Sequence, residues 1–174
     1  MIQLTFTSDL PVDRSRLWQA VTAMDGINDE MRPWLSMGAP PGVRDLQAVA
    51  LTPGKPLFRC RLKLFGLLPV GHSELTLLSL TPQEGFVEAS PMTGMRSWRH
   101  HRRLADSDTG CTLQDILEFE ARVFPRTTGA LVAFFFRHRH RRLRRRYRRV
   151  AMDFKQEDLK ALIERTMPFG KNQG

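Results

Sequence analysis

The chain opens with apolar residues at every second position, and this alternation predicts a half-buried β-strand. These residues are Ile2, Leu4 and Phe6. Asp9 and Pro11 then predict the start of a helix, because an acidic cap and an early proline suit a first turn. We expect this helix to end at Gly26 and a second, short helix to span about 28–36. A loop rich in proline and glycine follows over 37–42.

From about Asp45 onwards the apolar residues again recur at every second position. Turns that contain glycine, proline or aspartate interrupt the pattern at short intervals. The pattern predicts six short strands, at residues 46–51, 58–64, 72–80, 86–90, 95–104 and 111–123. Short strands joined by short turns indicate an antiparallel meander.

The most basic part of the chain carries a helical apolar stripe. Nine arginines lie within 137–149, yet apolar residues recur there at steps of three and four. The stripe consists of Val132, Phe136, Leu143, Tyr147, Val150 and Phe154. A solvated basic tail would not keep such a stripe, so we predict one long amphipathic helix that buries it. His140 lies within the stripe, and we expect a break near Asp153 before a short second helix.

The predicted order is a strand, two helices, about six strands and one long helix. Several segments in this order carry a resemblance to a known superfamily. They are Leu17-Trp18-Gln-Ala-Val21, Glu30-Met-Arg-Pro-Trp34-Leu, Phe65-Gly-Leu-Leu-Pro69, Trp98-Arg-His-His101, Gly110-Cys-Thr-Leu-Gln-Asp115 and Phe136-Arg-His-Arg-His-Arg-Arg-Leu143. The chain resembles the START-like superfamily (SRPBCC) of polyketide cyclases, lipid-transport proteins and Bet v 1-like proteins. It resembles most the bacterial members without an assigned function.

The resemblance implies an α+β helix-grip fold. In this fold a curved antiparallel sheet, here of about seven strands, wraps around the long C-terminal helix, and two short helices follow the first strand. The implied START-like domain spans 1–155, and a short helical tail with a frayed end spans 156–174. The resemblance also implies an apolar cavity between sheet and helix for a hydrophobic ligand, such as a lipid, quinone, sterol or polyketide. Fold alone does not select among these.

The last two strands predict a hairpin with Asp108 and Thr109 as its two-residue turn. The facing pairs are then Trp98 with Phe119, His100 with Leu117, Arg102 with Asp115, and Leu104 with Leu113. Because side chains alternate along a strand, all eight lie on one face of the sheet. The opposite face is charged, so we expect this face to look toward the long helix.

The polar residues on this apolar face have two interpretations. In the structural one, Arg102 and Asp115 neutralise each other near the sheet edge and His100 bonds to backbone. In the functional one, these three residues and His140 anchor a ligand, and His100 and Asp115 are the candidates for acid or base catalysis. The expected ligand contacts are Trp98, His100, Arg102, Asp115, Leu117, Phe119, Phe136, His140, Leu143, Tyr147 and Trp34.

The sequence contains no spacing typical of a metal or cofactor site. His100 and His101 are neighbours on a strand, and His138 and His140 lie about 200° apart on a helix, so neither pair can chelate one ion. A nucleophile elbow, a phosphate loop and a dinucleotide fingerprint are also missing. We therefore expect no metal and no cofactor. We predict a protein that binds a hydrophobic small molecule, with a cyclase- or dehydratase-like enzyme as the alternative.

The net charge of +9 belongs to the long helix. Of 27 basic residues nine are the arginines of 137–149, and the remaining 18 balance 18 acidic residues. The face formed by Arg137–Arg149 is either a solvated outer surface or a contact for an anionic membrane. Nucleic acid is disfavoured, because aromatic residues for base stacking are not interleaved on this face. No pattern specifies an oligomeric state.

Cysteine usage and the N-terminal segment indicate the compartment. Cys60 and Cys111 are too few for a disulfide framework, which fits a reducing compartment. The first residues, MIQLTFTSD, show neither a positively charged segment nor a long apolar run, so no secretory signal is readable. We expect a cytoplasmic protein.

Overall fold

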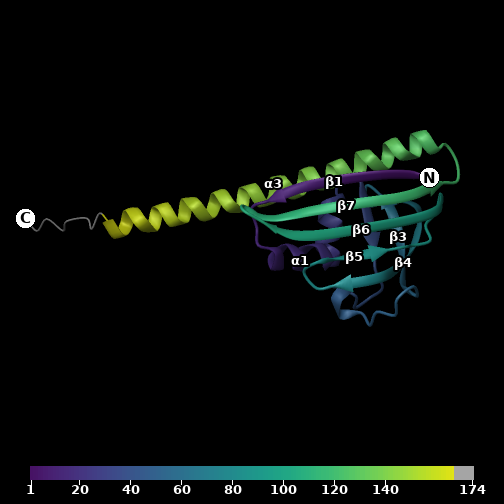
Figure 1. Ribbon diagram of the computed structural model, residues 1–174, viewed down its shortest axis with the longest axis horizontal. Coiled ribbons are helices and arrows are strands. Elements are labelled where there is room, and N and C mark those ends of the chain that lie inside the picture. Colours follow the sequence, from purple (N-terminus) through teal and green to yellow (C-terminus); the bar gives the residue numbers. More distant parts are fainter. Residues whose placement is uncertain (167–174) are drawn as a thin grey trace, which may run out of the picture.

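Seven strands and three α-helices make up the computed structural model, which describes residues 1–166 and the side chains of all of these except 153–155 and 158–166. Figure 1 shows their arrangement. In chain order they are β1 (Ile2–Leu10), α1 (Arg14–Thr22), α2 (Met24–Met31), β2 (Leu35–Gly38), the 3₁₀ helix η1 (Leu46–Ala48), β3 (Pro56–Leu64), β4 (Leu68–Thr81), β5 (Gly85–Glu88), β6 (Met95–Ser107), β7 (Gly110–Ala121) and α3 (Pro125–Thr166).

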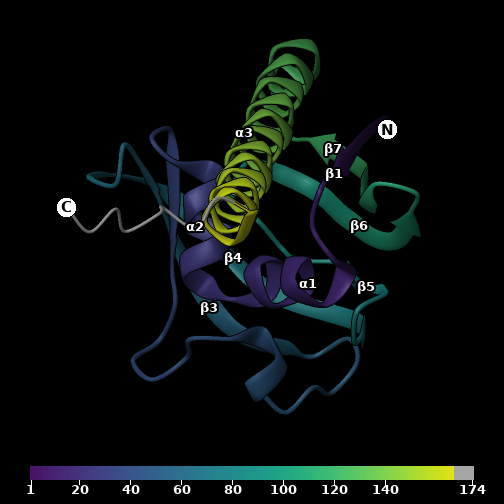
Figure 2. The same cartoon turned by 90° about the vertical axis from the view of Figure 1, so that its left-hand side faces the viewer.

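The strands form one antiparallel sheet in the order β1-β7-β6-β5-β4-β3-β2. The sheet curls around α3, and α1 and α2 close one end of the concave face (Figure 2). This is the predicted helix-grip arrangement of a curved sheet, a long C-terminal helix and two short helices after the first strand. Within residues 1–166, no helix combines the length and the apolar character needed to cross a bilayer.

The sheet has the expected number of strands, but one of them lies elsewhere in the chain. The predicted helix over 28–36 is wrong, because α2 ends at Met31 and β2 pairs with β3. Pro33 disfavours the helical conformation at Arg32, where the backbone is extended. The predicted strand over 46–51 is also wrong, since Asp45 caps a short 3₁₀ helix there.

The first helix begins and ends at other residues than predicted. Asp9 still belongs to β1, and Asp13 caps α1 by accepting a hydrogen bond from the backbone of Arg16. Gly26 does not end a helix but lies inside α2. A Cβ there would stand 1.8 Å from the carbonyl oxygen of Ala20, so glycine is required by the close approach of α1 and α2.

The predicted stripe of α3 faces the interior. Val132, Phe136, His140, Leu143 and Tyr147 are buried, and Val150 is half-buried. The side chain of Phe154 lies outside the described residues. The predicted break near Asp153 is wrong, since α3 continues to Thr166 and its last 16 residues, 151–166, contain neither glycine nor proline. This part of α3 extends beyond the sheet (Figure 1), and the proposed split at 155 stays a prediction.

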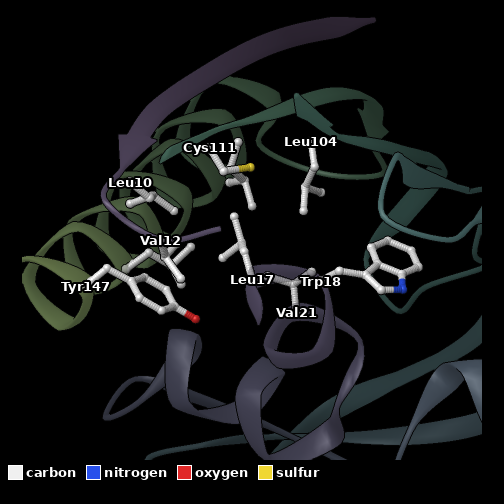
Figure 3. Close-up of a cluster of buried hydrophobic side chains, with 10 residues drawn as sticks. Leu10, Val12, Leu17, Trp18, Val21, Leu104, Cys111 and Tyr147 are labelled. Carbon is white, nitrogen blue, oxygen red and sulfur yellow. The ribbon is translucent and has the colours of Figure 1, made fainter. Parts of the chain in front are cut away.

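A buried cluster near the middle of α3 fixes the helix over the sheet. Tyr147 and Leu143 pack there against α1 and the ends of β1, β6 and β7. Figure 3 shows Tyr147 beside Val12, and Leu17 of α1 lies between these two side chains and Trp18. Because these residues are buried, the cluster holds α3 against α1 and the sheet beside the polar site.

Candidate functional site

The β6–β7 hairpin has the register that the sequence predicts. Trp98 pairs with Phe119, His100 with Leu117, Arg102 with Asp115, and Leu104 with Leu113, and Ser107 meets Gly110 across the turn. His100, Arg102 and Asp115 are all buried on the concave face. The alternation of the two strands therefore brings three ionisable groups into the interior.

Arg102 lies at the centre of a buried network of ion pairs. Its Nε and Nη2 donate to the two carboxylate oxygens of Asp115, at 2.7 and 2.8 Å. Its Nη1 and Nη2 donate to the two carboxylate oxygens of Glu30, each at 3.0 Å. Two bidentate pairs on one guanidinium satisfy an otherwise costly buried charge. Arg139 of α3 adds a further cation to Glu30, at 2.8 Å.

Two histidines surround Asp115. His100 donates through Nε2 to Asp115 Oδ1 at 2.9 Å, and its Nδ1 lies 3.5 Å from Glu88 Oε2. His140 donates through Nε2 to Asp115 Oδ2 at 3.1 Å. Its Nδ1 then accepts from the hydroxyl of Ser8 at 2.7 Å. His140 therefore links the strand network to α3 and does not point to solvent.

Burial and ion pairing oppose each other in this network. Burial alone would raise the pKa of Glu30 and Asp115. The guanidinium of Arg102, together with Arg139 at Glu30 and His100 at Asp115, outweighs burial and lowers both pKa values. Burial alone would lower the pKa of His100, but the Asp115 carboxylate and hydrogen bonds to Asp115 and Glu88 raise it. The ion pairs therefore favour the charged forms of Glu30, Asp115 and His100.

A cavity of about 230 Å³ lies beside this network, between the sheet, α2 and α3. Most of its wall is apolar. The apolar wall includes Ile27, Met31, Leu62, Leu75, Leu77, Met95, Val132, Phe135 and Phe136. The polar part consists of Ser73, Glu88, His100, Arg102 and Arg139. An apolar chamber with a few polar groups at one part of its wall is the usual form of a small-molecule site.

The structure separates the predicted ligand contacts into two groups. Trp98, His100, Arg102 and Phe136 line the cavity. The others are placed elsewhere: Asp115 and His140 in the network, Leu117 and Phe119 in a cluster with Phe136, Leu143 and Tyr147 in the cluster of Figure 3, and Trp34 half-buried at the surface. Four of the eleven predicted residues therefore line the cavity, and the other seven do not.

Two cavity residues carry buried polar atoms that lack a partner. Ser73 Oγ and Trp98 Nε1 have no hydrogen-bond partner among the described residues. Such atoms are rare in protein interiors, because each costs free energy when it leaves water. The indole N–H is a donor only, and the hydroxyl both donates and accepts. Both groups can therefore still donate a hydrogen bond.

Sequence reasoning missed two carboxylates of the site. Glu30 follows Ile27 by one helical turn and precedes Met31, so it lies on the apolar face of α2. A prediction that started this helix at Met24 would have placed Glu30 on that face. Glu88 alternates with Phe86 and Ser90 and so shares their face, and Ser90 donates to it at 2.5 Å. A buried carboxylate on an apolar face signals a buried cation nearby.

The described residues contain no group of three or more histidine, cysteine, aspartate or glutamate side chains arranged to hold a metal ion. Both cysteines are free and buried, and burial raises the pKa of the Cys60 thiol to about 12.

Several solved structures are similar to this chain in fold. Protein CV1439 from Chromobacterium violaceum has a TM-score of 0.66, with 13% identity over 83% of this chain and 96% of that one. Ara h 8.0201 has a TM-score of 0.58, with 12% identity over 82% and 95% of the two chains. DynU16, a protein in the dynemicin biosynthetic locus, has a TM-score of 0.57, with 15% identity over 82% of this chain and 46% of that one.

Curled sheet, gripped helix and interior cavity together define a helix-grip protein. The sequence profile of a family described as "Domain of unknown function (DUF8410)" matches residues 8–147, which is most of the chain. The chain belongs to this family. No match was found among curated protein sequences.

Proposed function

We propose that this protein binds a hydrophobic small molecule in the cavity between the sheet and α3. The observation that carries the proposal is an apolar chamber of about 230 Å³. Its lining residues include Ser73 and Trp98, whose buried polar atoms have no partner among the described residues. An apolar cavity of about 150 Å³ is already large enough to stay dry and bind benzene. The chamber of this protein therefore suits a ligand larger than a single aromatic ring.

The polar part of the wall favours a ligand with one hydrogen-bonding end. Arg102 uses its Nε and both terminal nitrogens on Asp115 and Glu30, so its charge is compensated and most of its N–H groups are engaged. Ser73 and Trp98 line the cavity, and their hydroxyl and N–H have no partner among the described residues. A carbonyl, phenol or hydroxyl on an apolar body fits these groups, as in a quinone, a sterol, a lipid or a polyketide.

An enzyme is the second candidate, because His100 borders the cavity and contacts two carboxylates. In a cyclase- or dehydratase-like reaction it would give or take a proton. Asp115 does not line the cavity, and its two oxygens accept hydrogen bonds from Arg102, His100 and His140. These bonds make Asp115 a positioning group for His100, and binding remains the function that the geometry favours.

The proposal is tested by filling the cavity. Val132 lines it and is buried, so Val132→Phe should occupy part of the chamber. The matched control is Val123→Phe, at a position that is 61% exposed. A fluorescent apolar probe should bind the wild type and the control saturably at one site, and a quinone, a sterol, a fatty acid and an aromatic polyketide should be compared as competitors. Equal probe binding by Val132→Phe would refute the cavity as the site.

A carrier and an enzyme can be distinguished by whether a bound competitor is chemically changed. A carrier releases the bound molecule unchanged, whereas an enzyme converts it at a rate that His100→Gln should reduce by at least about 100-fold. Both free cysteines fit a reducing compartment, so we propose that this binding takes place in the cytoplasm.

A further inference from the structure

The turn between β3 and β4 and the first residues of β4 expose several large apolar side chains. Leu67 is 80% exposed, and Phe65, Leu68 and Val70 are also exposed. We call residues 65–70 the hairpin tip. Single exposed apolar residues are normal, but a contiguous group of them marks a contact surface.

Aromatic contacts join the hairpin tip to α3. The ring of Phe65 lies 5.7 Å from that of Trp34, and the ring of Trp34 lies 5.4 Å from that of Phe134. Phe134 is exposed on α3, and Leu131, one turn before it, is both exposed and part of the cavity wall. One apolar surface therefore runs from the hairpin tip across Trp34 to the rim of the cavity.

The same side of α3 is strongly basic beyond Phe134. His138, Arg141 and Arg145 follow Phe134 at steps of four, three and four, so they continue its line along the helix. Arg137, Arg141 and Arg145 are exposed, and none of them has an ion-pair partner among the side chains described. The nearby acidic residues are engaged by other arginines: Glu30 by Arg139, and Asp29 by Arg142 and Arg146.

We propose that this surface docks on an anionic lipid bilayer. The hairpin tip and Trp34 would enter the boundary between headgroups and acyl chains, as the apolar face of an interfacial element does. The arginines of α3 would lie on the phosphate groups, which guanidinium recognises well. Self-association is disfavoured because the rows of arginines on two copies would repel each other. RNA is disfavoured because binding to RNA would leave the exposed leucines of the hairpin tip without an apolar contact.

Sedimentation with vesicles tests the docking surface. Full-length protein is mixed with phosphatidylcholine vesicles, with or without phosphatidylglycerol. We expect binding only to the anionic vesicles, with loss as salt increases. Leu67→Asp/Leu68→Asp should reduce binding at least tenfold, and Arg137→Gln/Arg141→Gln/Arg145→Gln should reduce it by about 100-fold. The control with the same charge change is Arg59→Gln/Arg99→Gln/Arg103→Gln, at exposed positions of the sheet strands β3 and β6.

Tryptophan fluorescence locates the contact. Trp34 is half-buried beside the hairpin tip, whereas Trp18 is buried in the core. Phospholipids brominated on the acyl chains should quench the wild type, and Trp34→Phe should remove this quenching. All variants are first checked by circular dichroism and for binding of the soluble cavity probe, which should be unchanged. Unchanged probe binding separates a failure of docking from a failure of the proposed function.

Three results would overturn the proposal: equal binding to neutral vesicles, equal loss with the control triple variant, or quenching that persists in Trp34→Phe. A dimer that Leu67→Asp/Leu68→Asp disrupts, without any vesicle binding, would assign the apolar surface to a second copy. Salt-sensitive RNA binding without vesicle binding would assign the arginines to nucleic acid.

Discussion

Arg102 in the sheet and Arg141 on α3 carry the same guanidinium in two very different surroundings. Arg102 is fully buried, and bidentate pairs to Glu30 and Asp115 hold it on both sides. Arg141 is exposed and has no ion-pair partner among the side chains described. The comparison shows that arginine content alone does not reveal the role of a residue. A compensated arginine supports the fold, whereas an uncompensated row of them is available for a partner.

The two surroundings also divide the expected effects of substitution. A change in the buried network removes hydrogen bonds for which water is not available, so it should act on stability. A change on the outer side of α3 leaves the fold intact, because water replaces what is lost, so it should act on binding.

The largest expected effect comes from Arg102→Met. This substitution leaves Glu30 and Asp115 without their shared cation, and we expect the free energy of unfolding to fall by about 3–5 kcal/mol. Urea unfolding followed by circular dichroism measures the loss. Arg141→Met is the matched control and should stay within about 0.5 kcal/mol of the wild type. Similar values for the two variants would contradict the contrast between the two arginines.

Two neighbouring carboxylates on α2 provide a smaller and more local comparison. Glu30 is buried, while Asp29 is 40% exposed and pairs with Arg142 and Arg146 at the surface. Glu30→Gln should cost about 1–3 kcal/mol, because Arg102 and Arg139 lose a charged acceptor. Asp29→Asn should cost between about 0 and 1 kcal/mol, as is usual for surface ion pairs. Thermal unfolding of both variants under one set of conditions checks this order.

Stability should fall at both acid and alkaline pH. The lowered pKa values of Glu30 and Asp115 contribute stability that is present above about pH 4 and is lost as pH falls through the folded values. The raised pKa of His100 contributes stability that is present below about pH 6.5 and is lost as pH rises through the folded value. Asp115, Glu88 and Arg102 are the charged groups that face this imidazole.

Unfolding free energies measured from acid to alkaline pH, in the wild type and in His100→Gln, separate the two losses. The variant should keep the acid loss and lack the alkaline one. An alkaline loss of the same size in His100→Gln would assign it to another group.

The smallest expected effect on stability is that of Ser73→Ala. Ser73 Oγ is buried and lacks a partner among the described residues, so its removal should change the free energy of unfolding by less than about 1 kcal/mol, in either direction. Affinity for the ligand should instead fall by about three- to tenfold, and Trp98→Phe should do the same. Calorimetric titration with the best competitor of the apolar probe measures this loss. A large loss of stability in Ser73→Ala would show that the hydroxyl already has a role in the empty protein.

Local patterns predicted the parts of the fold that depend on neighbouring residues. Strict alternation and a two-residue turn determine which side chains of β6 and β7 share a face, so the positions of His100, Arg102 and Asp115 followed from the sequence. The step of three and four placed His140 in the interior for the same reason.

Features that depend on contacts between distant segments could not be predicted in this way. Glu30 reaches Arg102 across 72 positions of the chain, and only the packing of α2 against the sheet brings the two together. The strand β2 forms because β3 offers it an edge, which overrides the weak helical signal of the residues after Pro33. The volume of the cavity depends on the distance between α3 and the curved sheet, and the periodicity of apolar residues does not encode this distance.

Native mass spectrometry after incubation with a lipid extract tests the central claim most directly, namely that the chamber beside the Arg102 network holds an apolar molecule. We predict that the wild type and Val123→Phe retain one bound mass that denaturation releases unchanged, while Val132→Phe, which occupies part of the chamber, retains much less of it. Wild-type protein that stays free of any bound mass in the extract, or Val132→Phe that retains as much of it as the wild type, would contradict the account.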